Sequence, residues 1–399
     1  MTHVAGIDLA RARADTPGCA HVTHFNNAGA GLMPQSVLDT MVAHLRREAT
    51  IGGYEAAAEA GNRLEAVYDE LAALLGCDRD EIAVVENATR AWDMAFYALR
   101  FDPGDRILCA RAEYESNVIA LLQVAKRTGA LVEPVPNDEH GRLSVAALGE
   151  MLDDRVKLVA ITHVPTNGGL VNPIEEVGAL TQAAGIAFLV DACQSIGQLP
   201  LDVGRIGCDM LSATGRKYLR GPRATGLLYI RRELADRLEP PLLDLHAAKW
   251  VAEDRYEIRP GARRFENWES NVAAKLGLGE ATRYARAWGI EAIEARVVAL
   301  AERLRAGLAR IEGVRVRDLG VRRCGIVSFT VEGRSSSAVK ADLARRAINV
   351  EVSPGHYTRY DMVERGMNDL VRASVHYYNS EEEVDALVAA VGEPGESPA

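Results

Sequence analysis

Short apolar runs alternate with longer amphipathic stretches from Ile82 onward. Residues 82–99 begin with the apolar run IAVV and continue with helical periodicity, and residues 105–129 repeat the same order. The same alternation continues as a strand, a helix and a strand at 131–136, 145–152 and 156–164. Strands that read as continuous apolar runs and alternate with helices are typical of a mainly parallel sheet covered on both faces. This half of the chain is therefore predicted to be α/β.

The stretch from Ile186 to Ile230 holds three apolar runs with two reactive side chains between them. The run IAFLV ends at Asp191, and the run DMLSA leads into TGRK, which ends at Lys217. A lysine amine can form a Schiff base with an aldehyde cofactor, and an aspartate can keep the pyridine nitrogen of that cofactor protonated. Alone, Asp191 would be interpreted as a strand-end cap and Lys217 as a solvated side chain. Together, just past the ends of neighbouring strands, they indicate pyridoxal phosphate (PLP).

A long amphipathic helix over 289–311 opens a second region of the chain. It is followed by predicted strands at 314–320, 324–333, 348–353 and 370–378, a helix at 336–347 and a last helix from 380. The expected division is an N-terminal arm (1–20), a large cofactor-binding domain (21–285), a smaller α+β domain (286–391) and a tail (392–399). The tail is rich in Pro and Gly and is expected to be mobile.

Composition narrows the class of protein. A chain of 399 residues is too long for one core and suits two domains. The net charge of −10 argues against nucleic acid, no apolar run approaches a membrane span, and the N-terminus lacks the apolar core of a signal peptide. The 6 cysteines show no CxxC spacing, so they indicate reduced thiols, no metal site and a cytoplasmic protein.

Three segments are specific enough to indicate a family: DACQ at 191–194, GRKYLRGPR at 215–223 and VRASVHYYNSEEEVD at 371–385. Through them the chain resembles the class V aminotransferase family of fold-type I PLP enzymes, which includes cysteine desulfurases and C–S lyases. The resemblance runs from about Asn26 to about Val391. It implies the fold of PLP-dependent transferases, with a mainly parallel seven-stranded sheet in the large domain. It also implies a homodimer with shared active sites.

The cofactor site is expected at the carboxyl ends of the strands. The helix that begins after Asn87 offers free amides, with Thr89 beside them, as a cradle for the phosphate; Asn87 can also be its N-cap. By resemblance, Tyr114 stacks on the ring, and either Thr166 or Asn167 contacts the ring oxygen. The full set expected to bind the cofactor is Asn87, Ala88, Thr89, Tyr114, Thr166, Asn167, Asp191, Gln194, Thr214, Arg216 and Lys217.

The substrate implied by the resemblance is an amino acid. At the position of Arg372 the family has an arginine that binds the substrate α-carboxylate. The planar guanidinium group can donate two parallel hydrogen bonds to a carboxylate. Asn27 is expected near the substrate, and Tyr54 is expected to reach the neighbouring subunit's site. Glu269 stands where desulfurases have a threonine that crosses the interface.

Two further arginines are candidate anion-binding residues of this site. Arg216 stands where desulfurases have a histidine before the lysine, and it suits phosphate or carboxylate binding. Arg223 is a second candidate anion-binding residue. The roles of both remain open in the sequence.

The reaction type depends on one loop. Desulfurases of the closest pattern carry a cysteine after a GH-type turn, but here the loop 353–362 reads SPGHYTRYDM, and no cysteine follows Cys324. This predicts that the chain is not a persulfide-forming desulfurase. The stretches EATIGGYEAAAEA and RKYLRGPR resemble the C–S lyase of ergothioneine biosynthesis, which favours β-elimination from a cysteine-derived conjugate. Transamination and epimerisation remain alternatives, and the intact Asp191–Lys217 pair argues against a non-catalytic module.

Overall fold

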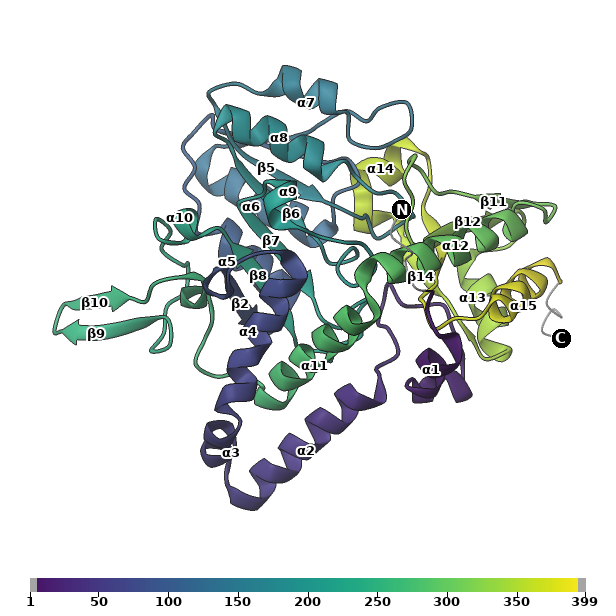
Figure 1. Cartoon of the computed structure of the whole chain (residues 1–399). Helices are drawn as coiled ribbons and strands as arrows, with labels where there is room; N and C mark the ends of the chain where they lie inside the picture. Colours follow the sequence, from purple (N-terminus) through teal and green to yellow (C-terminus); the bar gives the residue numbers. More distant parts are fainter. Residues whose placement is uncertain (1–5, 394–399) are drawn as a thin grey trace.

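A computed structural model describes residues 6–393, and its centre is a seven-stranded sheet (Figure 1). The strand order is β2-β8-β7-β6-β5-β3-β4. Strand β8 runs antiparallel to both of its neighbours, and the other adjacent pairs are parallel. The bounds are β2 Ile82–Val85, β3 Arg106–Cys109, β4 Leu131–Pro134, β5 Val156–Thr162, β6 Ala187–Asp191, β7 Met210–Thr214 and β8 Gly226–Ile230. The predicted α/β fold with a mainly parallel seven-stranded sheet is confirmed.

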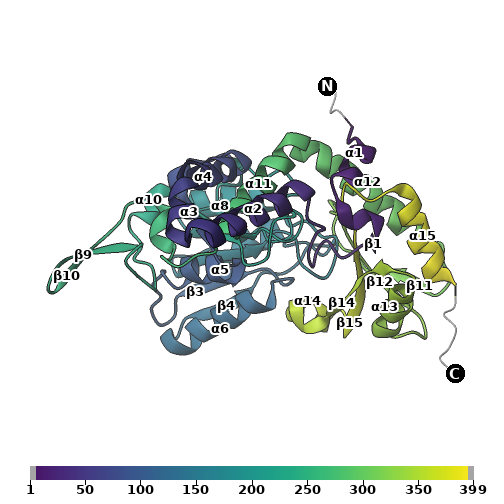
Figure 2. The same ribbon diagram turned by 90° about the horizontal axis from the view of Figure 1, so that it is seen from below.

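Helices cover both faces of this sheet, as Figure 2 shows from below. Alternate residues of one strand enter opposite cores, because side chains of a strand alternate between its faces. In β3, Leu108 packs in a core with residues of α4 (Gly61–Leu75) and α8 (Ile174–Ala184). Its neighbours Ile107 and Cys109 pack with α5 (Ala88–Phe96) and α6 (Glu115–Thr128). Burial on both faces explains why these strands read as unbroken apolar runs.

The C-terminal region is built on a four-stranded antiparallel sheet in the order β11-β12-β15-β14. It follows α12 (Ile290–Leu308), which begins directly after Gly289. The remaining bounds here are β11 Val314–Val316, β12 Ile326–Val331, α13 Ser336–Arg345, β13 Ile348–Asn349, β14 Glu351–Pro354, α14 Arg359–Glu364, β15 Asp369–Ser374 and α15 Glu381–Gly392. The proposed domain division at residue 285 stays a prediction.

The N-terminal segment pairs with the C-terminal region. Strand β1 (Thr23–His24) pairs parallel with β13, and Asn26 forms a bridge with Ser374. Further helices are α1 Leu9–Ala14, α2 Gln35–Ile51, α3 Gly53–Glu59, α7 Val145–Met151, α9 Val203–Ile206, α10 Arg232–Ala235 and α11 Val272–Trp288. None of the helices within residues 6–393 is long and apolar enough to cross a membrane. The predicted mobile tail lies outside the described residues except for 392 and 393.

A two-stranded hairpin was not predicted from the sequence. Strands β9 (Ala248–Ala252) and β10 (Arg255–Ile258) pair antiparallel and project from the sheet, at the left in Figure 1. Their residues are half-buried or exposed, and Trp250 is 78% exposed. A strand without a buried face has no alternating apolar pattern, so its sequence carries little signal.

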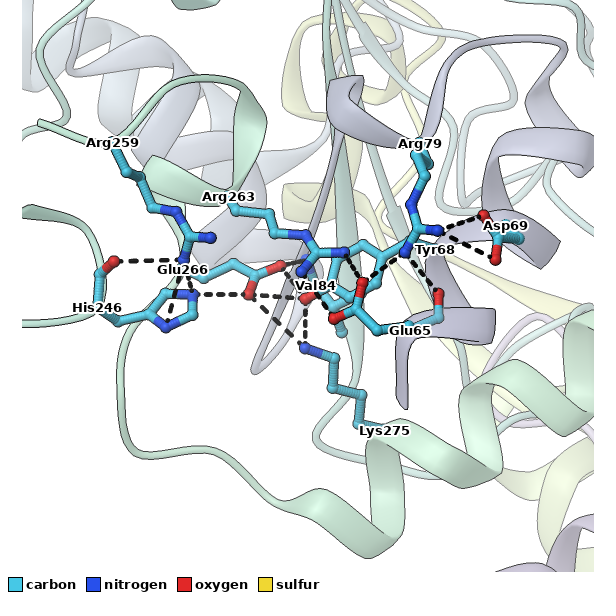
Figure 3. Close-up of polar contacts among 10 residues, drawn as sticks. All are labelled: Glu65, Tyr68, Asp69, Arg79, Val84, His246, Arg259, Arg263, Glu266 and Lys275. Carbon is cyan, nitrogen blue, oxygen red and sulfur yellow. Dashed lines mark hydrogen bonds and ion pairs between the residues drawn. The ribbon is translucent and has the colours of Figure 1, made fainter. Parts of the chain in front are cut away.

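The edge strand β2 donates a backbone hydrogen bond to a buried carboxylate (Figure 3). The backbone N–H of Val84 donates to Glu266 Oε1 at 2.7 Å. The Tyr68 hydroxyl donates to Glu266 at 2.8 Å, and His246 Nε2 lies 3.2 Å from its other oxygen. Lys275 Nζ donates to the Tyr68 hydroxyl. We call these five residues the Glu266 cluster; it satisfies an edge donor that would otherwise be open to pairing.

Candidate active site

The site lies where parallel strands β6 and β7 end side by side. Asp191 is the last residue of β6, and β7 ends at Thr214, three residues before Lys217. Adjacent parallel strands share one carboxyl edge, and ligands of open α/β sheets bind outside that edge. The register of β5 places Thr162 directly opposite Asp191. The fold therefore brings the predicted aspartate and lysine to the same edge.

Lys217 has an amine that nothing in residues 6–393 pairs with: its Nζ makes no hydrogen bond or ion pair there. Burial lowers the pKa of this amine, with opposing contributions from Cys193 and Asp191 and a further lowering from Arg216. A lowered pKa leaves more of the amine neutral. A neutral amine can add to a carbonyl, so the residue is chemically suited to its predicted role.

Asp191 is 4% exposed and is held by two neutral donors. Its Oδ1 accepts from the Cys193 backbone N–H at 2.9 Å, and its Oδ2 accepts from Asn117 Nδ2 at 3.0 Å. It forms no ion pair with any other described residue. Each donor approaches a different oxygen, which fixes the plane of the carboxylate while leaving acceptor capacity on both oxygens.

Thr166 and Asn167, the two alternatives for the ring-oxygen contact, lie in different surroundings. Arg372 Nη1 donates to Thr166 Oγ1 at 2.6 Å, and Gln194 Nε2 lies 3.3 Å from the same oxygen. Asn167 instead accepts from Ser353 Oγ at 2.6 Å. The structure thus groups Thr166 with the other predicted site residues, and it turns Asn167 toward β14.

Arg372 is a buried cation without a counterion. It is 5% exposed, its Nε has no partner in the structure, and no carboxylate of residues 6–393 lies within ion-pair distance. Burial lowers the pKa of its guanidinium, although Tyr218 and Glu351 oppose this. Gln194 Oε1 is a second buried atom without a partner. Unpaired buried polar atoms are costly and rare, so both suit a site that is completed by a bound molecule.

The glycine-rich loop after β1 packs against the lysine loop. Gly31 donates its N–H to the Arg216 carbonyl at 2.9 Å, and a Cβ at Gly31 would lie 2.6 Å from the Lys217 carbonyl oxygen. Asn27 donates to the Ser374 carbonyl at 2.6 Å and accepts from the Tyr378 hydroxyl, so its amide is occupied within the protein. The amide facing Arg372 is that of Asn26, at 3.5 Å, rather than that of the predicted Asn27.

Helix α5 begins at the same edge of the sheet. Asn87 is its N-cap and accepts from the Arg90 N–H at 2.8 Å, as expected. The amides of Ala88 and Thr89 have no protein acceptor in residues 6–393. Gly226 approaches this turn so closely that a Cβ there would lie 2.3 Å from the Asn87 carbonyl carbon. Free first-turn amides at a helix N-terminus bind phosphate.

The other predicted site residues range from buried (Thr214) through half-buried (Tyr114 and Arg216) to exposed (Arg223). Tyr114 precedes α6, with its ring centroid 6.3 Å from that of Tyr357, and Arg216 donates to the Gly29 carbonyl. Burial lowers the pKa of Arg216, and the neighbouring Arg223, which is exposed, adds to this. Thr214 Oγ1 lies 3.3 Å from the Thr225 carbonyl oxygen.

Tyr54 and Glu269 are not gathered into the site of their own chain. Tyr54 is 78% exposed on α3. Glu269 is exposed and lines a cavity of about 80 Å³ together with Thr225 and Asn267. Tyr54 was expected to reach the neighbouring subunit's site, and that expectation remains a prediction; Glu269 replaces a threonine that crosses the interface in desulfurases, and its role stays open.

Three residues of this neighbourhood were missed by sequence reasoning. Asn117 contacts Asp191, Glu113 contacts Asn117, and Cys193 lies close enough to Lys217 that each affects the pKa of the other. The four-residue spacing of Glu113 and Asn117 at the start of a helix was a usable signal for a contact between them. The contact of Asn117 with Asp191 spans 74 positions of sequence and had no local signal.

These features fit PLP. The free amides at the start of α5 suit its phosphate, the Asp191 carboxylate suits its pyridine nitrogen, and the unpaired Lys217 amine suits its aldehyde. The orphaned Gln194 oxygen and the Thr166 hydroxyl lie with them as further polar contacts. Arg372, whose Nε has no partner in residues 6–393, suits the carboxylate of an amino acid.

Comparisons with known proteins agree with this fit. The family model described as Aminotransferase class-V matches residues 23–387. A probable cysteine desulfurase of Pyrococcus abyssi is 31% identical over 391 residues, which is 96% of each chain. The apo structure of a cysteine desulfurase from Thermococcus onnurineus is 29% identical with a TM-score of 0.88, covering 96% of this chain and 97% of that one. A lysine-to-alanine variant of C-DES with glycine covalently linked to its PLP cofactor is 26% identical with a TM-score of 0.86, covering 96% and 99%.

These names correct the prediction of reaction type. The preference for a C–S lyase, the alternatives of transamination and epimerisation, and the exclusion of a persulfide-forming desulfurase were wrong, because full-length relatives at about this identity are named probable cysteine desulfurases and a solved structure of similar length is named a cysteine desulfurase. The error came from treating one loop thiol as the criterion for the whole reaction. The sequence of the loop 353–362 shows where a thiol is absent, but it says nothing of other thiols that the fold brings to the site.

Proposed function

This chain belongs to the class V aminotransferase family of PLP-dependent enzymes, and we propose that it is a cysteine desulfurase, which converts L-cysteine into L-alanine and transferable sulfur. One observation carries the proposal: the unpaired Lys217 amine lies among Asp191, Cys193 and Arg372, whose guanidinium has no carboxylate partner among the described residues. Such a site offers an amine, a carboxylate anchor and a thiol together. The names of the full-length relatives support cysteine as the substrate.

Each of these residues has a separate task in the proposed reaction. When bound, PLP withdraws electrons from the α-carbon of the amino acid, and Asp191 holds the charge on its ring nitrogen that makes this effective. Arg372 binds and orients the substrate carboxylate through its planar fork. Lys217 takes the proton from the α-carbon and returns a proton later in the cycle. Thr166 and Gln194 orient the ring from the side of Arg372.

Cys193 is the proposed sulfur acceptor. Of the six cysteines, Cys109, Cys208 and Cys324 are buried and Cys19, Cys77 and Cys193 are half-buried, and among these three only Cys193 affects the pKa of Lys217. Burial raises the pKa of the Cys193 thiol, so it is protonated near neutrality and needs a base. Lys217, whose pKa is lowered, can take this proton once it has given up the proton from the α-carbon, and it then delivers the thiol proton to Cβ.

The transfer step balances without an oxidant. The Cys193 sulfur forms a bond to the substrate sulfur, the Cβ–S bond breaks, and its electron pair passes to Cβ. A proton then completes the methyl group of alanine. The products are a Cys193 persulfide and alanine, and an added thiol can release the sulfur as sulfide.

The test is the identity of the carbon product. Purified enzyme with PLP is incubated with L-cysteine and dithiothreitol, and alanine, pyruvate, ammonia and sulfide are measured together. We expect alanine and sulfide in equal amounts. Pyruvate with ammonia would show elimination instead and would overturn the proposal. Cys193→Ala, compared with Cys77→Ala, should lose the persulfide seen by mass spectrometry before dithiothreitol is added.

A homodimer in the cytoplasm is the proposed setting. Large apolar side chains are exposed on the segment around the hairpin, as is Tyr54 on α3, and such exposure is typical of an interface. The exposed set is Leu242, Leu245, Trp250, Tyr256 and Trp268. The six unpaired cysteines favour a reducing compartment. Light scattering should give twice 43.2 kDa, and an active species at 43.2 kDa would contradict the dimer.

A further inference from the structure

Asn117 bridges two buried carboxylates. It lies in the first turn of α6 and is 4% exposed. Its Nδ2 donates to Asp191 Oδ2 at 3.0 Å and to Glu113 Oε1 at 2.9 Å. An amide nitrogen has two hydrogens, so both are used, one by each carboxylate. If the amide were flipped, its oxygen would face two carboxylate oxygens and no hydrogen bond could form. The Asn117 amide is therefore held with its nitrogen toward Asp191.

Glu113 holds this arrangement from the other side. It is 2% exposed, and its Oε2 accepts from the Thr162 N–H at 2.8 Å. Its Oε1 accepts from the Tyr114 N–H at 3.1 Å and from the Thr162 hydroxyl, in addition to Asn117. Thr162 ends β5 and is paired in register with Asp191. The loop before α6 and the ends of two strands are therefore joined through one carboxylate.

Glu113 is sensitive to the charge of its neighbour. Burial raises the pKa of Glu113 to about 7, the bonds from Thr162 and Asn117 oppose this, and the charge of Asp191 adds to it. The amide of Asn117 therefore lies between two carboxylates that affect each other.

We propose that Asn117 is a positioning residue that acts on bound PLP through Asp191, and that Glu113 fixes Asn117 in its donating orientation. Removing the amide leaves Oδ1 of Asp191 with the Cys193 N–H and leaves Oδ2 without the Asn117 donor. Asp191 then loses its fixed plane, and it pairs less well with the ring nitrogen. The inference rests on the proposed role of Asp191, but it does not depend on which amino acid is the substrate.

The test compares two buried asparagines. Asn117→Ala and Asn117→Asp are purified as holoenzymes, and the PLP dissociation constant and the visible absorption spectrum are measured from pH 6 to 9. Asn379→Ala is the matched control, because Asn379 is 1% exposed and its Nδ2 also donates to a carboxylate, Glu383, at 2.9 Å. Thermal unfolding of each apo-protein reports the structural cost separately.

We expect PLP to bind between about tenfold and a hundredfold more weakly to Asn117→Ala, the effect of one hydrogen bond to a charged group. The pH at which the spectrum changes should shift as well. Asn117→Asp keeps the shape but cannot donate, so it should be at least as impaired. Asn379→Ala should lower the unfolding temperature while leaving affinity and spectrum as in the wild type. Wild-type affinity and spectrum in Asn117→Asp would overturn the proposal.

A double-mutant cycle shows whether the effect passes through Asp191. In an Asp191→Asn background, Asn117→Ala should weaken PLP binding by less than twofold further, because the partner it positions has lost its charge. Additive losses would overturn the proposal. The readouts also separate this inference from the proposed function: if the enzyme makes pyruvate but the cycle behaves as expected, the desulfurase proposal fails and the positioning role stands.

Discussion

The molecule contains two buried polar clusters that differ in how completely their atoms are paired. In the Glu266 cluster (Figure 3), the carboxylate receives the Val84 N–H and the Tyr68 hydroxyl, and Lys275 donates to that hydroxyl. At the carboxyl edge of the sheet, the Lys217 amine, Arg372 Nε and Gln194 Oε1 have no partner in residues 6–393.

This difference separates residues that stabilise the fold from residues that bind the cofactor or the substrate. A buried polar group costs free energy unless it is paired, so a paired cluster stabilises the fold by itself. An unpaired cluster is tolerated where a bound molecule supplies the missing partners. Substitutions in the Glu266 cluster should therefore act on unfolding, and substitutions at the sheet edge should act on PLP, substrate or turnover.

Lys217→Ala should have the largest effect, because no other described amine lies beside Asp191. We expect loss of turnover below detection and loss of covalent PLP, with the chain still folded. Borohydride reduction followed by peptide mass mapping measures the attachment in the wild type. A reduced PLP-peptide that maps to another lysine would contradict the assignment.

Asp191→Asn should still bind PLP, no more tightly than Asn117→Ala does, and should lower turnover on the order of a hundredfold or more, because the shape persists while the charge on the ring nitrogen loses its partner. Steady-state kinetics with L-cysteine and a PLP:protein ratio measure the two effects separately. Near-normal turnover in this variant would assign Asp191 to a structural role and would remove the contrast between the two clusters.

Arg372→Ala should lower kcat/KM by about 2–4 kcal/mol, mainly through KM, because the substrate carboxylate loses a charge-assisted partner. Arg372→Lys should recover part of this, since an ammonium lacks the planar fork. The free energy of unfolding should change little in either variant, because the native guanidinium has no counterion to lose. A loss of stability as large as that expected for Glu266→Gln would contradict the view that Arg372 serves binding rather than the stability of the fold.

Glu266→Gln should have the smallest effect on function and a clear effect on stability, about 2 kcal/mol in the free energy of unfolding. Burial by itself would raise the pKa of Glu266, but donation from His246, Lys275 and Val84 outweighs this, and the pKa lies below its ordinary value of 4.5. Its contribution is then complete above about pH 4.5 and is lost as the pH falls through the folded-state pKa. Denaturant unfolding between pH 3 and 7 should show a steeper loss in the wild type than in the variant, with activity at pH 7 unchanged.

Much of the fold could be predicted from sequence, because the strands of the central sheet other than the edge strand β4 are largely buried on both faces and their apolar runs are local. The hairpin β9–β10 was missed because neither face is buried, so its residues follow no apolar period. The reaction type was predicted wrongly because the loop 353–362 is one of several segments that meet at the site.

The sequence by itself determined the cofactor, since Asp191 and Lys217 follow the ends of adjacent apolar strands and parallel strands must end at one edge. It also determined Arg372 as a candidate anchor, through the motif around it. Only the tertiary structure decided that Thr166 rather than Asn167 faces Arg372, that Asn26 rather than Asn27 lies beside it, and that Asn117 supports Asp191. These contacts join residues far apart in the chain, and their partners are set by strand register and side-chain direction, which no local pattern records.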